Sequence, residues 1–203
     1  QWDNFNGRVE AVQSVQLRPR VSGYIDAVNY REGDEVRKGQ VLFTIDDRSY
    51  RAALEQAKAE LARARSQASL ARSESGRSEK LIGTQAISRE AWEQRRSAAS
   101  QAQADVLAAE AAVDMAQLNL DFTRVTAPID GRASRAMITA GNLVTAGDSA
   151  SVLTTLVSQQ QMYVYFDVDE NTFLNYQAMA RQGQQRHALP VEIALVGEQG
   201  FPH

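Results

Sequence analysis

Proline is absent from a long central part of the chain. Pro19 and Pro128 bracket more than a hundred residues without a proline, and from residue 40 to residue 130 the only glycines are Gly76 and Gly83. A proline inside an α-helix removes a hydrogen bond and costs about 3 kcal/mol, so a gap of this length is typical of long helices. The flanks carry more closely spaced glycines with β-branched and aromatic residues between them. The predicted order is therefore β structure, long α-helices, then β structure.

The central part also shows two heptad patterns. In its second half, steps of seven residues place apolar or small side chains at one position, and the position three residues on is similar: Trp92, Ala99, Val106, Val113 and Leu120, then Arg95, Ala102, Ala109 and Ala116. The first half repeats the pattern with Leu54, Leu61 and Ala68, then Ala57, Ala64 and Ala71, before its register drifts into Ser75 and Ser78. Such stripes predict an antiparallel coiled-coil hairpin over residues 47–123.

The hairpin is expected to turn near residues 81–88. Gly83 supplies a permissive backbone just past the first helix, and Ser88 is a candidate N-cap for the second. Arms of about 33 residues give a rod of roughly 50 Å. Charges in residues 47–121 balance, with eleven acidic and eleven basic side chains, which predicts a solvated rod and not an electrostatic arm.

The flanks contain an internal repeat. Four pairs of residues are each separated by 108 positions: Gly23 and Gly131, Gly33 and Gly141, Val36 and Val144, and Gly39 and Gly147. Each copy then runs into an apolar strand, residues 41–45 in the first and 152–156 in the second, the latter displaced by three further residues. Glycines at equivalent places predict the same turns in both copies. Two such halves can pack face to face as a small β-sandwich, with the helical hairpin inserted between them.

The outer segments predict further β structure. Residues 2–15 are expected to form a strand, and Met162, Val164, Phe166 and Val168 alternate as one face of a half-buried strand. A short helix capped by Asp169 and ended by Gly183 is expected next, followed by a strand over residues 191–195.

Composition excludes several function classes. The chain has no cysteine and a net charge of −3, which argues against thiol chemistry and against nucleic-acid binding. No apolar run is long enough to span a membrane. His187 and His203 lie outside any metal-ligand spacing, and the acidic pairs Asp46–Asp47 and Asp167–Asp169 lie at strand-to-helix junctions, where capping accounts for them. We therefore expect no metal, no cofactor and no active site.

Three stretches together resemble a known family. These are LRPRVSGYI at residues 17–25, EGDEVRKGQVLFTID at 32–46 and TAPIDGRAS at 126–134. The two halves resemble a lipoyl or biotinyl domain, and with the inserted hairpin the chain resembles the periplasmic adaptors, or membrane fusion proteins, of tripartite multidrug efflux pumps of the resistance-nodulation-division (RND) type. At the hairpin tip, Arg77, Leu81 and Ser88 reproduce the spacing of that family's pattern for docking on an outer-membrane channel.

The resemblance implies an elongated, mixed α and β protein of three parts. Residues 21–46 and 124–157 would form the lipoyl-like sandwich, 47–123 the hairpin, and 1–20 with 158–203 an incomplete β-barrel. It further implies a non-enzymatic protein of the periplasm, anchored to the inner membrane by a segment upstream of this chain and continued by further barrel strands beyond it. Its partners would be an inner-membrane transporter, an outer-membrane channel and copies of itself in a ring, hexameric in the family.

The tip residues have both binding and structural interpretations. Arg77 can bond to carbonyls or carboxylates of a partner, Leu81 can fill an apolar notch, and Ser88 can bond to the partner, with Gly83 shaping the turn. Equally, an exposed arginine is often only solvated, a leucine near the tip can close its own coiled coil, and a serine before a helix is often a cap.

Three alternatives remain open at this point. The adaptor could belong to an ATP-driven exporter or a type I secretion system, which share the same plan. A self-contained coiled-coil scaffold is a second alternative. A carrier domain modified on lysine is a third, but Lys38 is not in a Met-Lys-Met or Asp-Lys-Ala turn, and the hairpin occupies the place of the carrier turn.

Overall fold

The computed structural model describes residues 4–147, 150–159, 161–181 and 191–194. The chain divides into two compact units, one formed by Ala11–Gln161 and the other by Gln1–Glu10 with Met162–His203. The larger unit contains a helical hairpin and two β-sheets.

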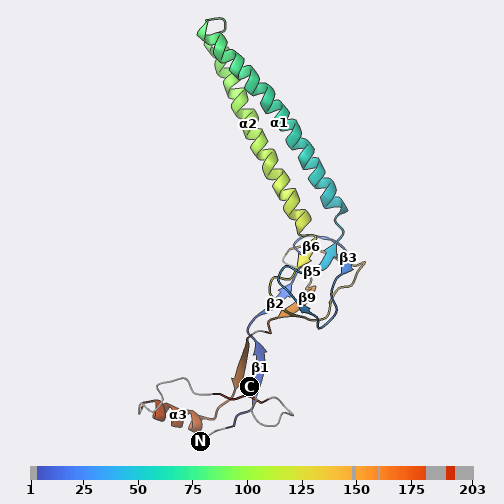
Figure 1. The fold of residues 1–203 in the computed structure, drawn as a ribbon, viewed down its shortest axis with the longest axis vertical. Helices are drawn as coiled ribbons and strands as arrows, with labels where there is room; N and C mark the ends of the chain where they lie inside the picture. Colours follow the sequence, from blue (N-terminus) through green and yellow to red (C-terminus); the bar gives the residue numbers. More distant parts are fainter. Residues whose placement is uncertain (1–3, 148–149, 160, 182–190, 195–203) are drawn as a thin grey trace. The chain divides into compact units, whose positions relative to one another are not determined.

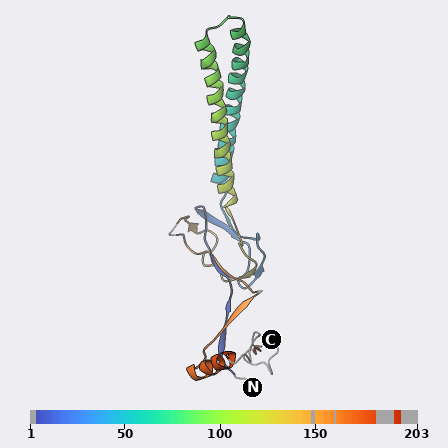
Figure 2. The same cartoon turned by 90° about the vertical axis from the view of Figure 1, so that its left-hand side faces the viewer.

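The hairpin consists of α1 (Arg48–Gly83) and α2 (Arg89–Asp121), which lie side by side along their length in both views (Figures 1 and 2). The expected long helical hairpin is thus confirmed. The heptads predict its seam well, because Leu54 and Ala64 of α1 and Ala102, Val106 and Ala109 of α2 are all buried. On α2 the exception is Arg95, which is exposed although it occupies a seam position.

The predicted drift of register in α1 is wrong. Ser75 is half-buried, Ser78 is fully buried, and Ile82 continues the same seven-residue steps to the end of the helix. The hydroxyl of Ser78 donates a hydrogen bond to the backbone carbonyl of Ser75 at 2.7 Å, which satisfies it inside the seam. Serine therefore acts here as one more small residue that allows the two helices to approach closely.

Two four-stranded sheets form the rest of the larger unit. The strand order of the first is β2 (Ser14–Leu17), β9 (Thr154–Val157), β7 (Gly131–Ala133) and β4 (Glu35–Val36). The strand order of the second is β6 (Arg124–Thr126), β5 (Val41–Ile45), β3 (Gly23–Val28) and β8 (Leu143–Val144). Side chains from both sheets, Phe43 and Leu156 among them, share one hydrophobic core. Each large apolar side chain buried in it contributes about 1.5–3 kcal/mol.

In the structure, each half of the 108-residue repeat places one short strand beside a strand of the other half. Val36 of β4 lies opposite Gly131 of β7, and its counterpart Val144 of β8 lies opposite Gly23 of β3. Loop contacts repeat in the same way, since Gly33 N–H donates to Ala133 at 2.9 Å and Gly141 N–H donates to Ile25 at 2.8 Å. Each half therefore supplies strands to both sheets.

The repeated glycines have two different roles. Gly33, Gly39, Gly141 and Gly147 all have positive φ angles, from 83° to 105°, as equivalent turns require. At Gly23 and Gly131 the reason is space. A Cβ on Gly131 would lie 2.3 Å from the backbone oxygen of Val157, and one on Gly23 would lie 2.6 Å from Ile45.

The smaller unit contains β1 (Gly7–Ala11), paired with β10 (Met162–Phe166), and α3 (Glu170–Arg181). The single strand expected over residues 2–15 is instead divided, because β1 and β2 belong to different sheets. The alternation of β10 is only partly reflected in burial. Val164 is half-buried, whereas Phe166 is 43% exposed and stacks on Phe5 with ring centroids 5.4 Å apart.

Some expectations for the smaller unit fall outside the described residues. Gly183, the expected end of the short helix, and both histidines lie there. The strand expected over 191–195 is not found at residues 191–194, which have no regular secondary structure. An incomplete β-barrel in this part of the chain stays a prediction.

Candidate partner-binding site at the hairpin tip

The chain reverses direction between α1 and α2 around the carbonyl of Leu81. That oxygen accepts hydrogen bonds from the backbone N–H groups of Thr84 at 3.2 Å and Ala86 at 3.0 Å, and from the Thr84 hydroxyl at 3.0 Å. These bonds satisfy a carbonyl that the end of the helix would otherwise leave without a partner.

Gly83 does not make the turn. It is the last residue of α1, and the residue with a positive φ is Gln85, at 58°. A Cβ on Gly83 would meet nothing within 4 Å. The prediction that Gly83 supplies a permissive backbone beyond the helix is therefore wrong. The sequence does not indicate Gln85 as the turning residue. A left-handed conformation costs a residue with a Cβ about 1–2 kcal/mol, so glycine is the residue expected there.

Ser88 begins α2 as its N-cap. Its extended backbone, with φ −74° and ψ 155°, leads into the helix, and its hydroxyl oxygen accepts a hydrogen bond from the Ala91 N–H at 3.1 Å. The predicted cap is confirmed. Loss of such a cap costs about 1 kcal/mol, so Ser88 has a structural role whatever else it does.

Arg77 and Leu81 lie four residues apart, which places them on the same face of α1. Leu81 is 39% exposed, whereas Ile82 turns toward the seam and is half-buried. Leu81 therefore does not close the coiled coil. Arg77 is exposed, and the described residues offer its guanidinium no ion pair or side-chain hydrogen bond. Both side chains are accessible to a partner.

The hairpin tip also has a surface depression. It is lined by Ile82, Gln85, Ile87, Arg89 and Trp92. The guanidinium of Arg96 lies over the Trp92 ring, 5.4 Å from its centroid, which orients the indole. Sequence reasoning placed Trp92 in the heptad but did not identify this depression, because its lining comes from both helices and from the turn.

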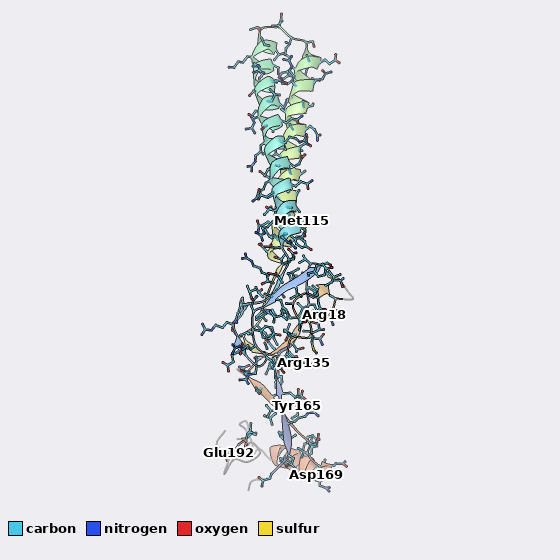
Figure 3. The ribbon with its side chains drawn as sticks, turned by 90° about the vertical axis from the view of Figure 1, so that its right-hand side faces the viewer. Arg18, Met115, Arg135, Tyr165, Asp169 and Glu192 are labelled. Carbon is cyan, nitrogen blue, oxygen red and sulfur yellow. The ribbon has the colours of Figure 1, made fainter. Side chains whose placement is uncertain are left out.

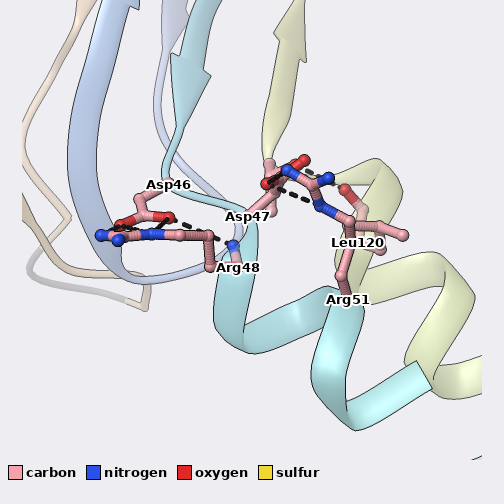
Figure 4. Close-up of polar contacts among 6 residues, drawn as sticks. Asp46, Asp47, Arg48, Arg51 and Leu120 are labelled. Atoms are coloured by element: carbon pink, nitrogen blue, oxygen red, sulfur yellow. Dashed lines mark hydrogen bonds and ion pairs between the residues drawn. The ribbon is translucent and has the colours of Figure 1, made fainter. Parts of the chain in front are cut away.

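The opposite end of the hairpin carries two arginine–aspartate pairs. Figure 4 shows Arg48 bound to Asp46 and Arg51 bound to Asp47, where β5 passes into α1. The bonds from Arg48 hold the pKa of the Asp46 carboxyl at about 2, below its ordinary 3.8. The prediction that the acidic residues at the strand-to-helix junctions cap the following helices is only partly confirmed. Asp47 is the N-cap of α1 but makes no side-chain cap bond, whereas Asp169 accepts the Thr172 N–H at 3.1 Å.

No cluster of histidine and carboxylate side chains suited to a metal ion occurs within the described ranges. The helices described there also include none that is long and apolar enough to cross a lipid bilayer.

At Lys38 the backbone N–H donates to the Asp130 carboxylate at 2.8 Å, which links this turn to the second half of the repeat. The tip presents an exposed cation, an exposed leucine and a depression with Ile82, Ile87 and Trp92 in its lining.

Comparison with known proteins identifies the family. Residues 13–156, most of the chain, match the family model described as the barrel-sandwich hybrid domain of RND membrane fusion proteins. The chain belongs to the RND membrane fusion proteins. This result confirms the resemblance drawn from the sequence motifs.

Named relatives of this membrane fusion protein support the assignment. The multidrug efflux pump subunit AcrA of Escherichia coli K12 is 36% identical over 196 residues, which cover 96% of this chain and 49% of AcrA. The multidrug export protein AcrE of the same strain is 36% identical over 201 residues, covering 97% and 51%. The chain thus spans about half the length of these relatives.

Solved structures agree with this assignment. A MacA–MexA chimera that contains the Pseudomonas aeruginosa MexA α-hairpin domain has a TM-score of 0.62 and 27% identity, covering 83% of this chain and 55% of the chimera. A putative efflux transporter from Bacteroides eggerthii has a TM-score of 0.58 and 28% identity, covering 85% and 48%. The likeness therefore extends to the folded structure.

Proposed function

We propose that this membrane fusion protein is a periplasmic adaptor that links an inner-membrane drug transporter to an outer-membrane channel. Membership of the RND family carries this proposal, and the names of AcrA and AcrE as multidrug efflux and export proteins support it. In this function the chain performs no chemistry. It supplies surfaces that hold two membrane proteins together. The adaptor itself would be anchored to the inner membrane through a segment upstream of residue 1.

The hairpin tip is the proposed docking surface for the channel. Arg77 would donate hydrogen bonds to carbonyl or carboxylate oxygens of the partner, because its guanidinium is exposed and uncommitted. Leu81 would enter an apolar notch four residues further along the same face. Ser88 would hold the start of α2 in place, and its hydroxyl hydrogen remains available to a partner because the cap bond uses only the oxygen. Gly83 would contribute a side-chain-free surface at the end of α1.

Copies of the chain would surround the path of the drug as a ring, hexameric as in the family. An adaptor for an ATP-driven exporter or a type I secretion system is the second possibility, and the match to the RND model favours the first. Co-purification of the full-length protein with native membranes distinguishes them by the transporter recovered.

The test of the tip is a charge reversal. We expect Arg77→Asp to abolish drug resistance in cells that depend on this adaptor, because the exposed donor becomes an acceptor facing carbonyl or carboxylate oxygens. The measurement is the lowest drug concentration that stops growth, which should fall to the value of cells without the adaptor. The helical circular dichroism signal should stay unchanged, since Arg77 has no intramolecular partner among the described residues.

Arg135→Asp provides the matched control. This arginine is also exposed but lies after β7, in the sheet-forming part of the chain (Figure 3). Resistance should survive this change. Full resistance with Arg77→Asp would refute the assignment of the tip.

A further inference from the structure

The seam between α1 and α2 changes its composition before it reaches the tip. On the side of the sheets it contains a buried apolar cluster, which consists of Ala64, Val106 and Ala109 with Leu61 and Ala68 packed against it. The next α1 seam positions toward the tip carry no side chain larger than serine: Ala71, Ser75 and Ser78. The tip then has its own half-buried apolar side chains, Ile82, Ile87 and Trp92. Two packed regions are therefore separated by a stretch that buries little apolar surface and gains little stability from it.

The facing stretch of α2 is equally poor in large side chains. Arg65 donates to Glu110 at 2.9 Å and Arg72 donates to Gln103 at 3.2 Å, and these two bonds fix the level of one helix against the other. Three residues further toward the tip, Ser75 is therefore level with Ser100. Residues 97–100 are two alanines between two serines.

Direct polar contacts between the two helices also end at this point. Within the described hairpin, no side chain of residues 73–83 forms a hydrogen bond or ion pair with a side chain of residues 89–102. The polar side-chain contacts there stay within one helix or its turn, as between Ser78 and Ser75 or Arg89 and Glu93. The tip is thus joined to the rest of the hairpin mainly by the backbones of the two helices.

Gly76 lies in the middle of this stretch, inside a helix of 36 residues. A Cβ there would meet nothing within 4 Å, so packing does not require a glycine. What the glycine changes is the backbone, because it has more conformational freedom than alanine and weakens the interior of a helix. Ser75 precedes it, and the Ser75 carbonyl accepts the Ser78 hydroxyl at 2.7 Å. Glycine–serine pairs, and hydroxyl groups bonded back to the preceding turn, are both places where helices bend.

The base of the hairpin has contacts that this stretch lacks. The Tyr50 hydroxyl of α1 donates to the Ser22 carbonyl at 2.6 Å. At the end of α2, the Arg20 guanidinium lies over the Phe122 ring, 5.0 Å from its centroid. Both aromatic side chains pack against the core that the two sheets share. Side chains therefore hold both helices where they join the sheets.

We propose that residues 75–78 of α1 and residues 97–100 of α2 form a hinge, at which the tip bends relative to the rest of the hairpin. This inference deepens the proposed adaptor function and rests on it for its purpose. A tip that tilts at this hinge aligns Leu81 and Ser88 with the surface of a partner, while the base of the hairpin and the sheets stay in place.

Distances between two spin labels test for the hinge, since the chain has no native cysteine. Labels on Ala62→Cys and Lys80→Cys span the hinge, and labels on Glu55→Cys and Ser73→Cys lie before it. All four positions are exposed. The two labels of each pair are separated by five full helical turns, so they lie on the same side of α1, about 27 Å apart in a straight helix.

Double electron–electron resonance on the full-length protein measures both distributions of distance. Because both labels of a pair project from one side of the helix, a bend toward or away from that side changes the distance between them. We expect the distribution for positions 62 and 80 to be about twice as broad as that for positions 55 and 73.

Gly76→Ala should narrow the distribution for positions 62 and 80 to the width of the other pair, because alanine restricts the backbone. Gly83→Ala is the matched control. It also adds a Cβ that meets nothing within 4 Å, but it lies beyond all four labels and should change neither distribution.

Two results would overturn the proposal. Equal widths for the two pairs would show that α1 does not bend preferentially at residues 75–78. A broad distribution that Gly76→Ala leaves unchanged would show that the glycine is not the cause. No channel or transporter takes part, so these outcomes are independent of the resistance assay on Arg77. The hinge can be absent from a working adaptor, and a hinged hairpin can belong to a chain whose tip binds no channel.

Discussion

Single residues at the hairpin tip and base show what local sequence rules leave out. Gly83 looked like the residue that turns the chain, yet Gln85 adopts the left-handed conformation and Gly83 stays helical. The hydrogen bonds that the Leu81 carbonyl accepts from residues after the helix accompany the left-handed conformation of Gln85. Residue propensities for secondary structure do not predict such bonds. Ser88, in contrast, could be predicted as a cap from its position before a heptad, because a cap bond involves only residues three apart.

Asp46 at the base of the hairpin gives a prediction for pH. Because Arg48 lowers the pKa of this carboxyl to about 2 from an ordinary 3.8, ionised Asp46 stabilises the folded protein above about pH 4, and this contribution is lost as the pH falls toward 2. We expect Arg48→Ala to return the pKa toward 3.8, measured by NMR titration of the Asp46 side chain. The pair is exposed, so its effect on stability should be small.

Arg51→Ala is the control for Asp46. Its guanidinium pairs with the neighbouring Asp47 and affects the pKa of Asp46 only weakly. A low pKa that persists in Arg48→Ala, or an equal rise in both variants, would contradict the assignment of Arg48 as the cause.

At the scale of elements, the heptads predicted which sides of the two helices meet. The repeat of seven residues is a direct consequence of helix geometry, so it can be read from sequence wherever the seam is apolar. The predicted drift at Ser75 and Ser78 is wrong: Ser75 is half-buried, and the buried Ser78 satisfies its hydroxyl by donating to the Ser75 carbonyl. The balanced total charge of residues 47–121 likewise concealed the separation of basic α1 from acidic α2.

A seam of small residues predicts sensitivity to size. Ala109 is 8% exposed between the two helices, and we expect Ala109→Leu to lower the free energy of unfolding by about 1–3 kcal/mol, because the added atoms force the helices apart. Urea unfolding followed by helical circular dichroism measures this. Ala112→Leu, three residues on and exposed, should change stability by less than about 0.5 kcal/mol. Equal losses in both variants would place the seam elsewhere.

For the whole molecule, the 108-residue repeat predicted the equivalent turns and the presence of two halves. It could not predict that Val36 pairs with Gly131 and Val144 with Gly23, since the offset relates equivalent residues and says nothing about which strands become neighbours. In the smaller unit, alternation in β10 indicated a strand but not its environment, because burial there depends on which segments cover each face. The tip depression was missed for the same reason.

Gly131 tests the packing of the two halves. A Cβ there would lie 2.3 Å from the Val157 oxygen, a backbone atom that cannot move without disturbing β9. We expect Gly131→Ala to lower the free energy of unfolding by more than about 2 kcal/mol and to speed hydrogen exchange in β7 and β9. Gly141→Ala introduces a Cβ into open space at a φ of 86°, and should cost only about 1–2 kcal/mol. The reverse ranking would contradict the close approach.

The exchange of strands between halves also constrains the order of folding. Paired residues such as Phe43 and Val125, or Leu17 and Thr154, are more than eighty positions apart, so both sheets are complete only after β9, which ends at Val157, has been synthesised. Contacts this distant in sequence are slow to form, because a long loop must first be closed. We expect pairing of α1 with α2 to shorten that search, because it brings the ends of the two halves to the same end of the hairpin. We therefore expect substitutions in the seam between α1 and α2 to slow the folding of the two sheets, although the seam residues do not contact them.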